Sequence, residues 1–97
     1  MKLFVVIPKE LLDRNLARFW KELVMRIHRK YPKAHIMSNY TGIGSFDEAD
    51  VIIFIYEYKD TDSYKALMEK CKEQGKTYNF FKEFYTPEPF YSPDEEY

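Results

Sequence analysis

The sequence predicts a small three-layer α/β domain whose mostly parallel sheet has four strands in the order 2-1-3-4. The first reason is the apolar run over residues 49–56, rich in β-branched and aromatic side chains, which is typical of a strand buried on both faces. A similar run covers residues 2–7. Stretches of helical periodicity follow both runs, and strands that alternate with helices form parallel sheets covered by helices.

The first half of the chain is expected to hold a strand, one long helix and a second strand. Residues 2–7 form the first strand. Apolar residues then recur at spacings of three and four over residues 9–31, which predicts a single helix of about 22 residues. Pro32 ends this helix, because proline lacks the N–H group that the helix needs. Residues 34–38 form the second strand.

The second half is expected to hold a loop, the central strand, a helix and a fourth strand. Residues 39–44 are rich in turn formers. Ser45 and Glu48 match a capping box, which predicts one short helical turn before the central strand. An apolar stripe of helical period follows that strand, and Gly75 is the predicted C′ residue of this helix. Residues 76–81 alternate as the fourth strand.

The domain is expected to occupy residues 1–82, and residues 83–97 form a tail rich in proline, tyrosine and acidic residues, extended or disordered. The fourth strand is an exposed edge unless the tail covers it, and such an edge favours a homodimer. No apolar segment is long enough to cross a membrane, and the start lacks a signal-peptide cleavage site. With Cys71 as the only cysteine, a cytoplasmic protein is expected.

Charge is distributed unevenly along the chain, although the net charge is only −1. Residues 1–37 hold nine basic and three acidic residues, a formal charge of +6, whereas residues 38–97 hold six basic and thirteen acidic residues, or −7. This asymmetry is consistent with solvated surface charges, with an anionic partner for the basic half, or with pairing between copies. The low content of Asn and Gln favours a thermophilic source.

A ligand site is expected at the carboxyl edge of the sheet, where the first and third strands part. Backbone N–H groups of the glycine loop at residues 41–45 suit an anion, although two glycines are equally typical of an ordinary turn. The spacing of these glycines fits neither the dinucleotide fingerprint nor the P-loop. The predicted ligand-binding residues are Lys9, Thr41, Gly42, Gly44, Ser45, Asp60, Asp62 and Ser63.

Acidic residues after the central strand allow a second interpretation of this edge. Glu57, Asp60 and Asp62 could serve acid–base or metal chemistry, and the two aspartates are also well placed to cap the following helix. His28 and His35 have no Cys or His partner nearby, so neither a metal site nor a cofactor is predicted. Cys71 lies on the apolar stripe and is expected in the core.

The long helix offers an alternative interface for nucleic acid. Its basic residues outside the apolar stripe are Arg14, Arg18, Lys21 and Arg29. These could contact phosphates, or could form the solvated face of a helix that packs on the core. Trp20 belongs to the buried stripe, so the aromatic side chains expected for single-strand binding are missing from the basic face.

Three residue pairs mark the second half: Ala49-Asp50 before the central strand, Asp62-Ser63 at a helix start, and Gly75-Lys76 after that helix. Together with the proline-ended first strand and the long helix, they resemble the nucleoside 2-deoxyribosyltransferase-like branch of the Rossmann-like nucleotide-binding domains. The resemblance spans residues 1–81. It implies a Rossmann-like domain whose central strand bears the active groups at its carboxyl end.

The same resemblance implies that catalysis is lost. In that family the loop after the central strand reads Asp-Ser-Gly-Thr, and a glutamate three residues after the threonine attacks the sugar. Here Tyr64, Lys65 and Met68 stand for the glycine, the threonine and the glutamate. Glu69 is one position late, which turns it about 100° round the helix. The chain therefore resembles a shortened member without the catalytic glutamate.

The leading hypothesis is a non-catalytic α/β module that binds an anionic, nucleotide-like small molecule or a protein partner. A nucleic-acid-binding protein and a structural or adaptor homodimer are the alternatives from other classes. An enzyme that transfers glycosyl groups of nucleosides through Glu57 or Glu69 is the least favoured, because its motif is broken.

Overall fold

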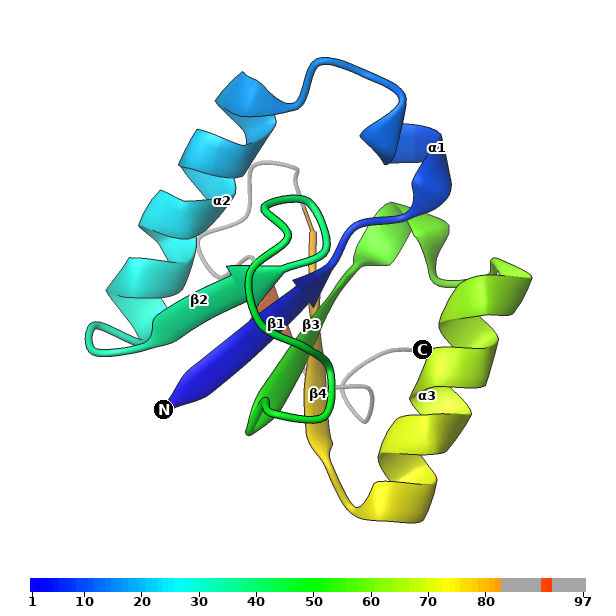
Figure 1. Ribbon diagram of the computed structural model, residues 1–97. Coiled ribbons are helices and arrows are strands. Elements are labelled where there is room, and N and C mark those ends of the chain that lie inside the picture. The colour runs from blue at the N-terminus through cyan, green and yellow to red at the C-terminus, as the bar shows by residue number, and fades with distance from the viewer. Residues whose placement is uncertain (83–89, 92–97) are drawn as a thin grey trace.

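The computed structural model describes residues 1–82 and 90–91, with only the backbone of Tyr91 (Figure 1). The sheet has the strand order β2-β1-β3-β4-β5, in which the first four are parallel and β5 runs antiparallel to β4. The strands are β1 (Lys2–Val6), β2 (His35–Ser38), β3 (Val51–Ile55), β4 (Thr77–Phe81) and β5 (Phe90–Tyr91). The helices are α1 (Lys9–Leu12), α2 (Ala17–Lys30), the 3₁₀-helix η1 (Tyr56–Tyr58) and α3 (Asp62–Gln74).

The predicted α/β class and the order of the four parallel strands are confirmed. Strand β3 is central, and all five of its residues are buried, as expected for a strand covered on both faces. Strand β1 lies between β2 and β3, with Phe4 opposite both Met37 and Ile52. The chain therefore reverses its direction of travel across the sheet at β1, which creates the switch point between β1 and β3.

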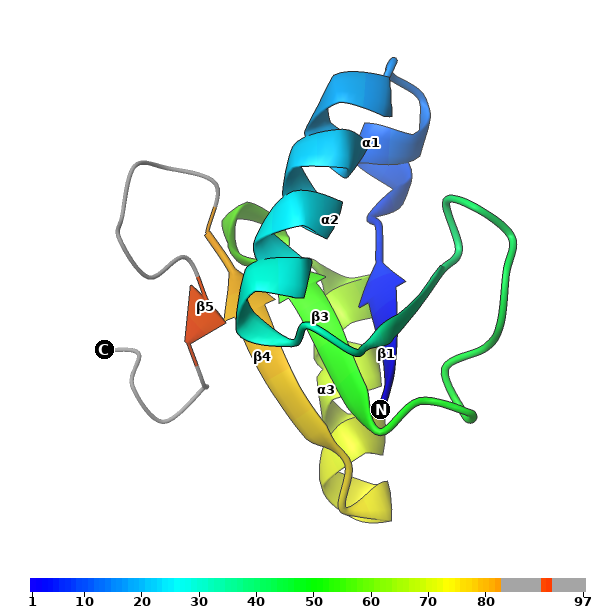
Figure 2. The same cartoon turned by 90° about the vertical axis from the view of Figure 1, so that its left-hand side faces the viewer.

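Helices α2 and α3 cover opposite faces of the sheet, with α2 in front of the strands and α3 behind them in Figure 2. Phe19 of α2 packs edge-on against Phe81 at 6.2 Å between ring centroids. On the other face, Phe54 packs edge-on against Tyr64 of α3 at 4.9 Å. Because side chains alternate along a strand, Ile55 next to Phe54 points toward the α2 face.

The single helix predicted over residues 9–31 is wrong, because the structure contains α1 and α2 with a break between them. The break follows Asp13, and α2 begins after Asn15, whose Oδ1 accepts a hydrogen bond from the Ala17 N–H at 3.2 Å. Asp and Asn side chains compete for backbone hydrogen bonds and favour helix ends. Leu16 keeps its place in the apolar pattern and is buried at 5% exposure, so periodicity alone hides the break.

The short helical turn predicted after Ser45 is a hydrogen-bonded turn and not a helix. The Ser45 hydroxyl donates to the Glu48 carboxylate at 3.2 Å, and the Ala49 N–H donates to the Phe46 carbonyl at 3.3 Å. The connection from β2 to β3 is therefore a loop over residues 39–50. In Figure 1 this loop passes in front of β2 and β1, and in Figure 2 it extends beyond the β2 edge of the sheet.

The end of α3 and the start of the tail complete the fold. Gly75 ends α3 with a positive φ of 67°, as the sequence predicts. Phe90 is buried and packs on Phe81 at 5.1 Å, so β5 covers the carboxyl end of the β4 edge. Apart from β5, the predicted tail lies outside the described residues. Within the described part of the chain, no helix has the length and apolarity needed to cross a bilayer.

Candidate functional site

On its α3 side, the switch point between β1 and β3 is filled by a tyrosine. Tyr64 is fully buried, and its hydroxyl donates to the Val6 carbonyl while accepting from the Ile55 N–H at 3.2 Å. Burial raises the pKa of the Tyr64 phenol well above its usual range, because the phenolate would lose its hydration. The neutral hydroxyl therefore links the two strands where a ligand group would otherwise enter.

Asparagine closes the neighbouring gap between β1 and β2. The Asn39 Oδ1 accepts from the Ile7 N–H and its Nδ2 donates to the Ile7 carbonyl, both at 2.8 Å. The side chain thus continues the ladder between these strands by one step beyond their last backbone pair. Both backbone polar groups of Ile7 are already hydrogen-bonded to Asn39, so they are not available to a ligand at this strand end.

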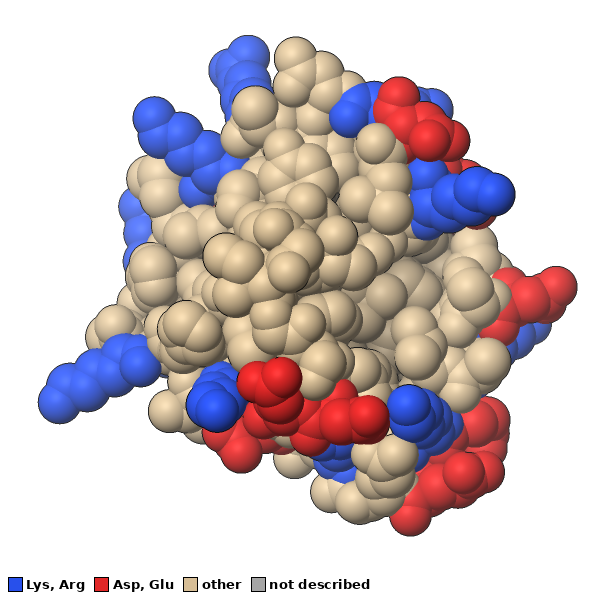
Figure 3. Space-filling model, in the orientation of Figure 1, with Lys and Arg blue, Asp and Glu red and all other residues tan. Residues whose placement is uncertain are grey.

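The predicted glycine loop folds back on β2. Ile43 forms an antiparallel bridge with Ser38, and both loop glycines have positive φ, 71° at Gly42 and 75° at Gly44. A Cβ at Gly44 would lie 2.1 Å from the Met37 sulfur, so glycine is required there for close packing. Residues 39–46 carry no charge and contribute to the uncharged surface at the centre of Figure 3. No cationic side chain of this segment is available for an anion.

The other predicted ligand residues stay at the carboxyl edge but form no cluster with this loop. Lys9 begins α1, and residues 60–63 lie at the start of α3. Among the described residues, no hydrogen bond or ion pair joins these two segments to each other or to residues 41–45.

The predicted capping of α3 by Asp60 or Asp62 is wrong. Thr61 occupies the N-cap position, and its hydroxyl donates to the Tyr58 carbonyl at 2.9 Å instead of capping the helix. Asp62 lies in the first turn of α3, where its charge still favours the positive end of the helix dipole.

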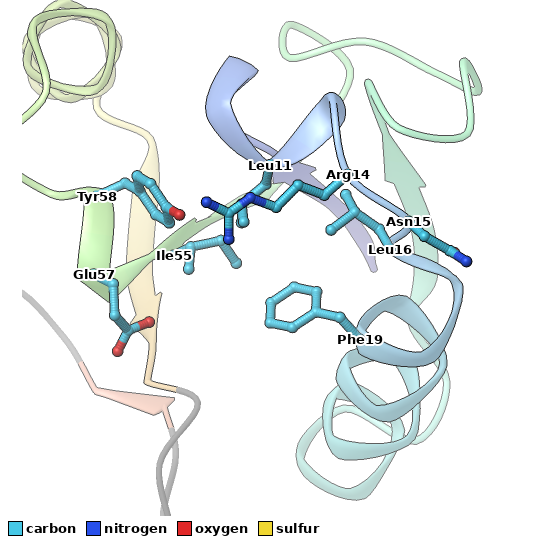
Figure 4. Close-up of a pocket in the computed structure, with 8 residues that line it drawn as sticks. All are labelled: Leu11, Arg14, Asn15, Leu16, Phe19, Ile55, Glu57 and Tyr58. Carbon is cyan, nitrogen blue, oxygen red and sulfur yellow. The ribbon is translucent and has the colours of Figure 1, made fainter.

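A pocket of about 280 Å³ opens on the α2 side of the same sheet edge (Figure 4). Its residues come from α1, the turn between α1 and α2, the first turn of α2, the end of β3 and η1. They are Leu11, Arg14, Asn15, Leu16, Phe19, Ile55, Glu57 and Tyr58. The break between α1 and α2 makes this pocket, because it sets the short helix aside from the long one above the end of β3.

The pocket combines an apolar floor with a charged and polar rim. Leu16 and Ile55 are buried and Phe19 is half-buried, whereas Arg14 and Glu57 are exposed. In Figure 4 the Arg14 side chain extends over Ile55 toward Tyr58, and the Asn15 amide points away from the space. Within the described residues, no salt bridge joins Arg14 to Glu57. The Arg14 guanidinium is thus placed to meet an anion above an apolar surface.

Two residues that the sequence offers as candidates line this pocket: Arg14, from the nucleic-acid alternative, and Glu57, from the acidic group after the central strand. Arg18, Lys21 and Arg29 are exposed on α2, while Arg14 lies in the turn before it. Figure 3 shows Lys and Arg side chains projecting along the α2 side of the molecule. The four cations therefore do not share one helix face.

The cysteine and the possible metal ligands among the described residues form no further site. Burial raises the pKa of the Cys71 thiol, which lies in the core. No group of three His, Cys, Asp or Glu side chains within the described part of the chain is placed to hold a metal ion. A second hollow of about 360 Å³, at the amino end of β2, is lined by Met1, Lys30, Tyr31, Pro32, Lys33 and Ala34.

Comparison of the chain with protein-family models, curated proteins and solved structures gives no match. The resemblance to the nucleoside 2-deoxyribosyltransferase-like group thus rests on the sequence pairs alone. At one of the differing positions, the structure gives a physical consequence: Tyr64 stands for the motif glycine, and its ring and hydroxyl fill the space beside the central strand.

Sequence reasoning missed the pocket because it missed the break in the helix. Asp13, Arg14 and Asn15 are three consecutive polar residues, two of them favoured at helix ends, and they carried the available signal. Glu57 is one of the acidic residues that follow the central strand, but no pattern in the sequence places it across the pocket from Arg14. That proximity depends on the fold of η1.

Proposed function

We propose that the chain is a small, non-catalytic α/β binding module for an anionic small molecule, with the pocket beside Arg14 as its site. One observation carries the proposal. An arginine without an ion-pair partner among the described residues lies over an apolar floor beside the β1–β3 switch point. Ligands of open parallel sheets bind at this place, and ligand pockets combine apolar walls with a few polar groups.

The size of the pocket restricts the ligand. Pockets for drug-sized molecules measure roughly 300–1,000 Å³, and this one measures about 280 Å³. A single ring with an acidic substituent suits that space. A nucleotide, which the resemblance implies, could place only part of itself inside. We therefore propose a ligand smaller than a nucleotide, with its carboxylate or phosphate group at Arg14.

Catalysis on nucleosides is the least supported function. Met68, half-buried on α3, stands where the resembled family has its attacking glutamate. Tyr64 occupies the neighbouring space with a hydroxyl that is held by two strands. A homodimer has less support than the sequence suggests, because β5 covers part of the edge on which that hypothesis depends.

Nucleic-acid binding is the second candidate, favoured by the exposure of Arg18, Lys21 and Arg29 on α2. It requires duplex binding that weakens steeply with salt, because phosphate contacts release counterions.

We place the protein in the cytoplasm, since its single cysteine is buried and needs no oxidising compartment.

Thermal unfolding with and without ligand tests the proposal. The probes are para-methylbenzoate, inorganic phosphate and adenosine monophosphate. At ten times the dissociation constant, a bound ligand stabilises the folded state by about 1.4 kcal/mol, which raises the Tm of a domain of this size by roughly 5–10 °C.

The Arg14→Gln variant should lose this shift, whereas the matched Arg18→Gln variant, an exposed arginine one turn along that does not line the pocket, should keep it. No shift with any of the three anions, or equal loss in both variants, would overturn the proposal.

A further inference from the structure

The wall of the pocket opposite Arg14 carries a negative charge. Glu57 and Tyr58 come from η1, the 3₁₀ turn that directly follows β3. Figure 4 shows Arg14 entering from the α1–α2 turn and Glu57 standing on the far side of Ile55. The two charges therefore belong to separate elements, with the apolar floor between them.

Hydrogen bonds fix η1 in this position. The Tyr58 carbonyl accepts from both the N–H and the hydroxyl of Thr61, at 3.1 and 2.9 Å. The Lys59 N–H donates to the Tyr56 carbonyl at 3.1 Å. This wall of the pocket is therefore a hydrogen-bonded turn that is connected to the start of α3.

Two lysines lie over the ring of Tyr56, the residue before Glu57. The ammonium groups of Lys59 and Lys82 lie 4.7 and 4.9 Å from the centre of the Tyr56 ring. Tyr56 packs on Phe80, on the α3 face, whereas the pocket lies on the α2 face. In the described part of the chain, Glu57 lines the pocket and has no salt-bridge partner.

We infer that the ligand of this pocket is a zwitterion, which places its anionic group at Arg14 and a cationic amine at Glu57, with a flat apolar body on Ile55 and Phe19. The inference rests on the proposed function and names the class of ligand for the same site. A ligand with both charges pairs each wall with its opposite, whereas a simple anion leaves the Glu57 carboxylate facing like charge. Tyr58 supplies a phenol that can donate or accept beside either group.

Three probes built on the same para-substituted benzene ring separate the contributions of the two walls. They are para-(aminomethyl)benzoate, which carries both charges, para-methylbenzoate, which carries only the anion, and para-methylbenzylamine, which carries only the cation. Dissociation constants from calorimetry or NMR titration of the full chain at low salt are compared. The zwitterion should bind roughly fivefold more tightly than para-methylbenzoate, the size expected for one exposed charge pair.

Two variants assign this preference to its residues. Glu57→Gln should remove the preference for the zwitterion and leave the affinity for para-methylbenzoate equal or higher. Arg14→Gln should weaken both. Glu73→Gln, which removes an exposed carboxylate on α3 outside the pocket, is the matched control and should change neither.

The outcomes distinguish this inference from the proposal on which it rests. If both benzoates bind equally and Glu57→Gln changes nothing, the zwitterion is wrong and the anion site stands. If neither benzoate binds, or the amine alone binds best, both the inference and the proposed function are wrong.

Discussion

Replacing Tyr64 by phenylalanine removes one hydroxyl and keeps the ring that packs on Phe54. In the native fold that hydroxyl serves the Val6 carbonyl and the Ile55 N–H, both within the buried ends of β1 and β3. A buried polar group left without a partner costs about 1–3 kcal/mol. Tyr64→Phe leaves two such groups, the Val6 carbonyl and the Ile55 N–H, and small movements of the strands reduce part of the cost. We therefore expect Tyr64→Phe to lower the free energy of unfolding by about 2–3 kcal/mol.

Urea unfolding followed by far-ultraviolet circular dichroism measures this change. The midpoint should fall at an unchanged m-value, because the surface exposed on unfolding stays the same. The matched control is Tyr78→Phe, a half-buried tyrosine on the same face whose hydroxyl makes no hydrogen bond among the described residues. We expect it to stay within about 0.5 kcal/mol of the native chain. Equal stability of the two variants would refute the bridging role of Tyr64.

The same bridge has a pH signature. Because burial raises the pKa of Tyr64 in the folded state, the folded chain keeps a proton that the unfolded chain releases near pH 10. The stabilisation that the protonated Tyr64 gives to the folded state is fully present below about pH 10. Above that pH, the free energy of unfolding falls by about 1.4 kcal/mol per pH unit. The stability difference between the native chain and Tyr64→Phe should therefore shrink as the pH rises above 10. A constant difference would contradict the buried, protonated phenol.

Two further substitutions test the packing. Gly44→Ala should lower the free energy of unfolding in urea by about 2–4 kcal/mol, because the new Cβ meets Met37 and the φ of residue 44 is positive. Gly42→Ala has a similar φ but open space around it, so it should lower the free energy of unfolding by only about 1 kcal/mol. Equal losses in the two variants would count against the close contact between residue 44 and Met37. Leu23→Ala on α2, fully buried, should cost about 2–5 kcal/mol in the same assay, whereas the exposed Leu12→Ala should cost under about 1 kcal/mol.

The sheet could be predicted from the sequence because its signals are local. The apolar run over residues 49–56 marks a strand without reference to its neighbours, and the helical stripes on either side dictate parallel pairing. Gly75 is likewise a local signal, since a helix end there needs a positive φ.

The site could not be predicted in the same way, because it depends on contacts between distant residues. The apolar stripe placed Tyr64 inside, but spacing cannot show that its hydroxyl reaches β1, 58 residues away. Leu16 fits the helical period on both sides of a break, so the pattern concealed the turn that carries Arg14. Phe90 lies in a segment of tail-like composition, yet it forms part of β5 and pairs with Phe81 of β4. Composition does not report such pairing.

Backbone-amide NMR of the isotope-labelled chain, titrated with para-methylbenzoate, locates the bound anion on the fold. We expect chemical-shift changes at residues 11–19 and 55–58, which surround the pocket, and their loss in Arg14→Gln. Changes confined to Lys9, residues 41–45 and residues 60–63 would place the ligand at the glycine loop and rule out the pocket beside Arg14 as the site. No change at any amide would rule it out as well.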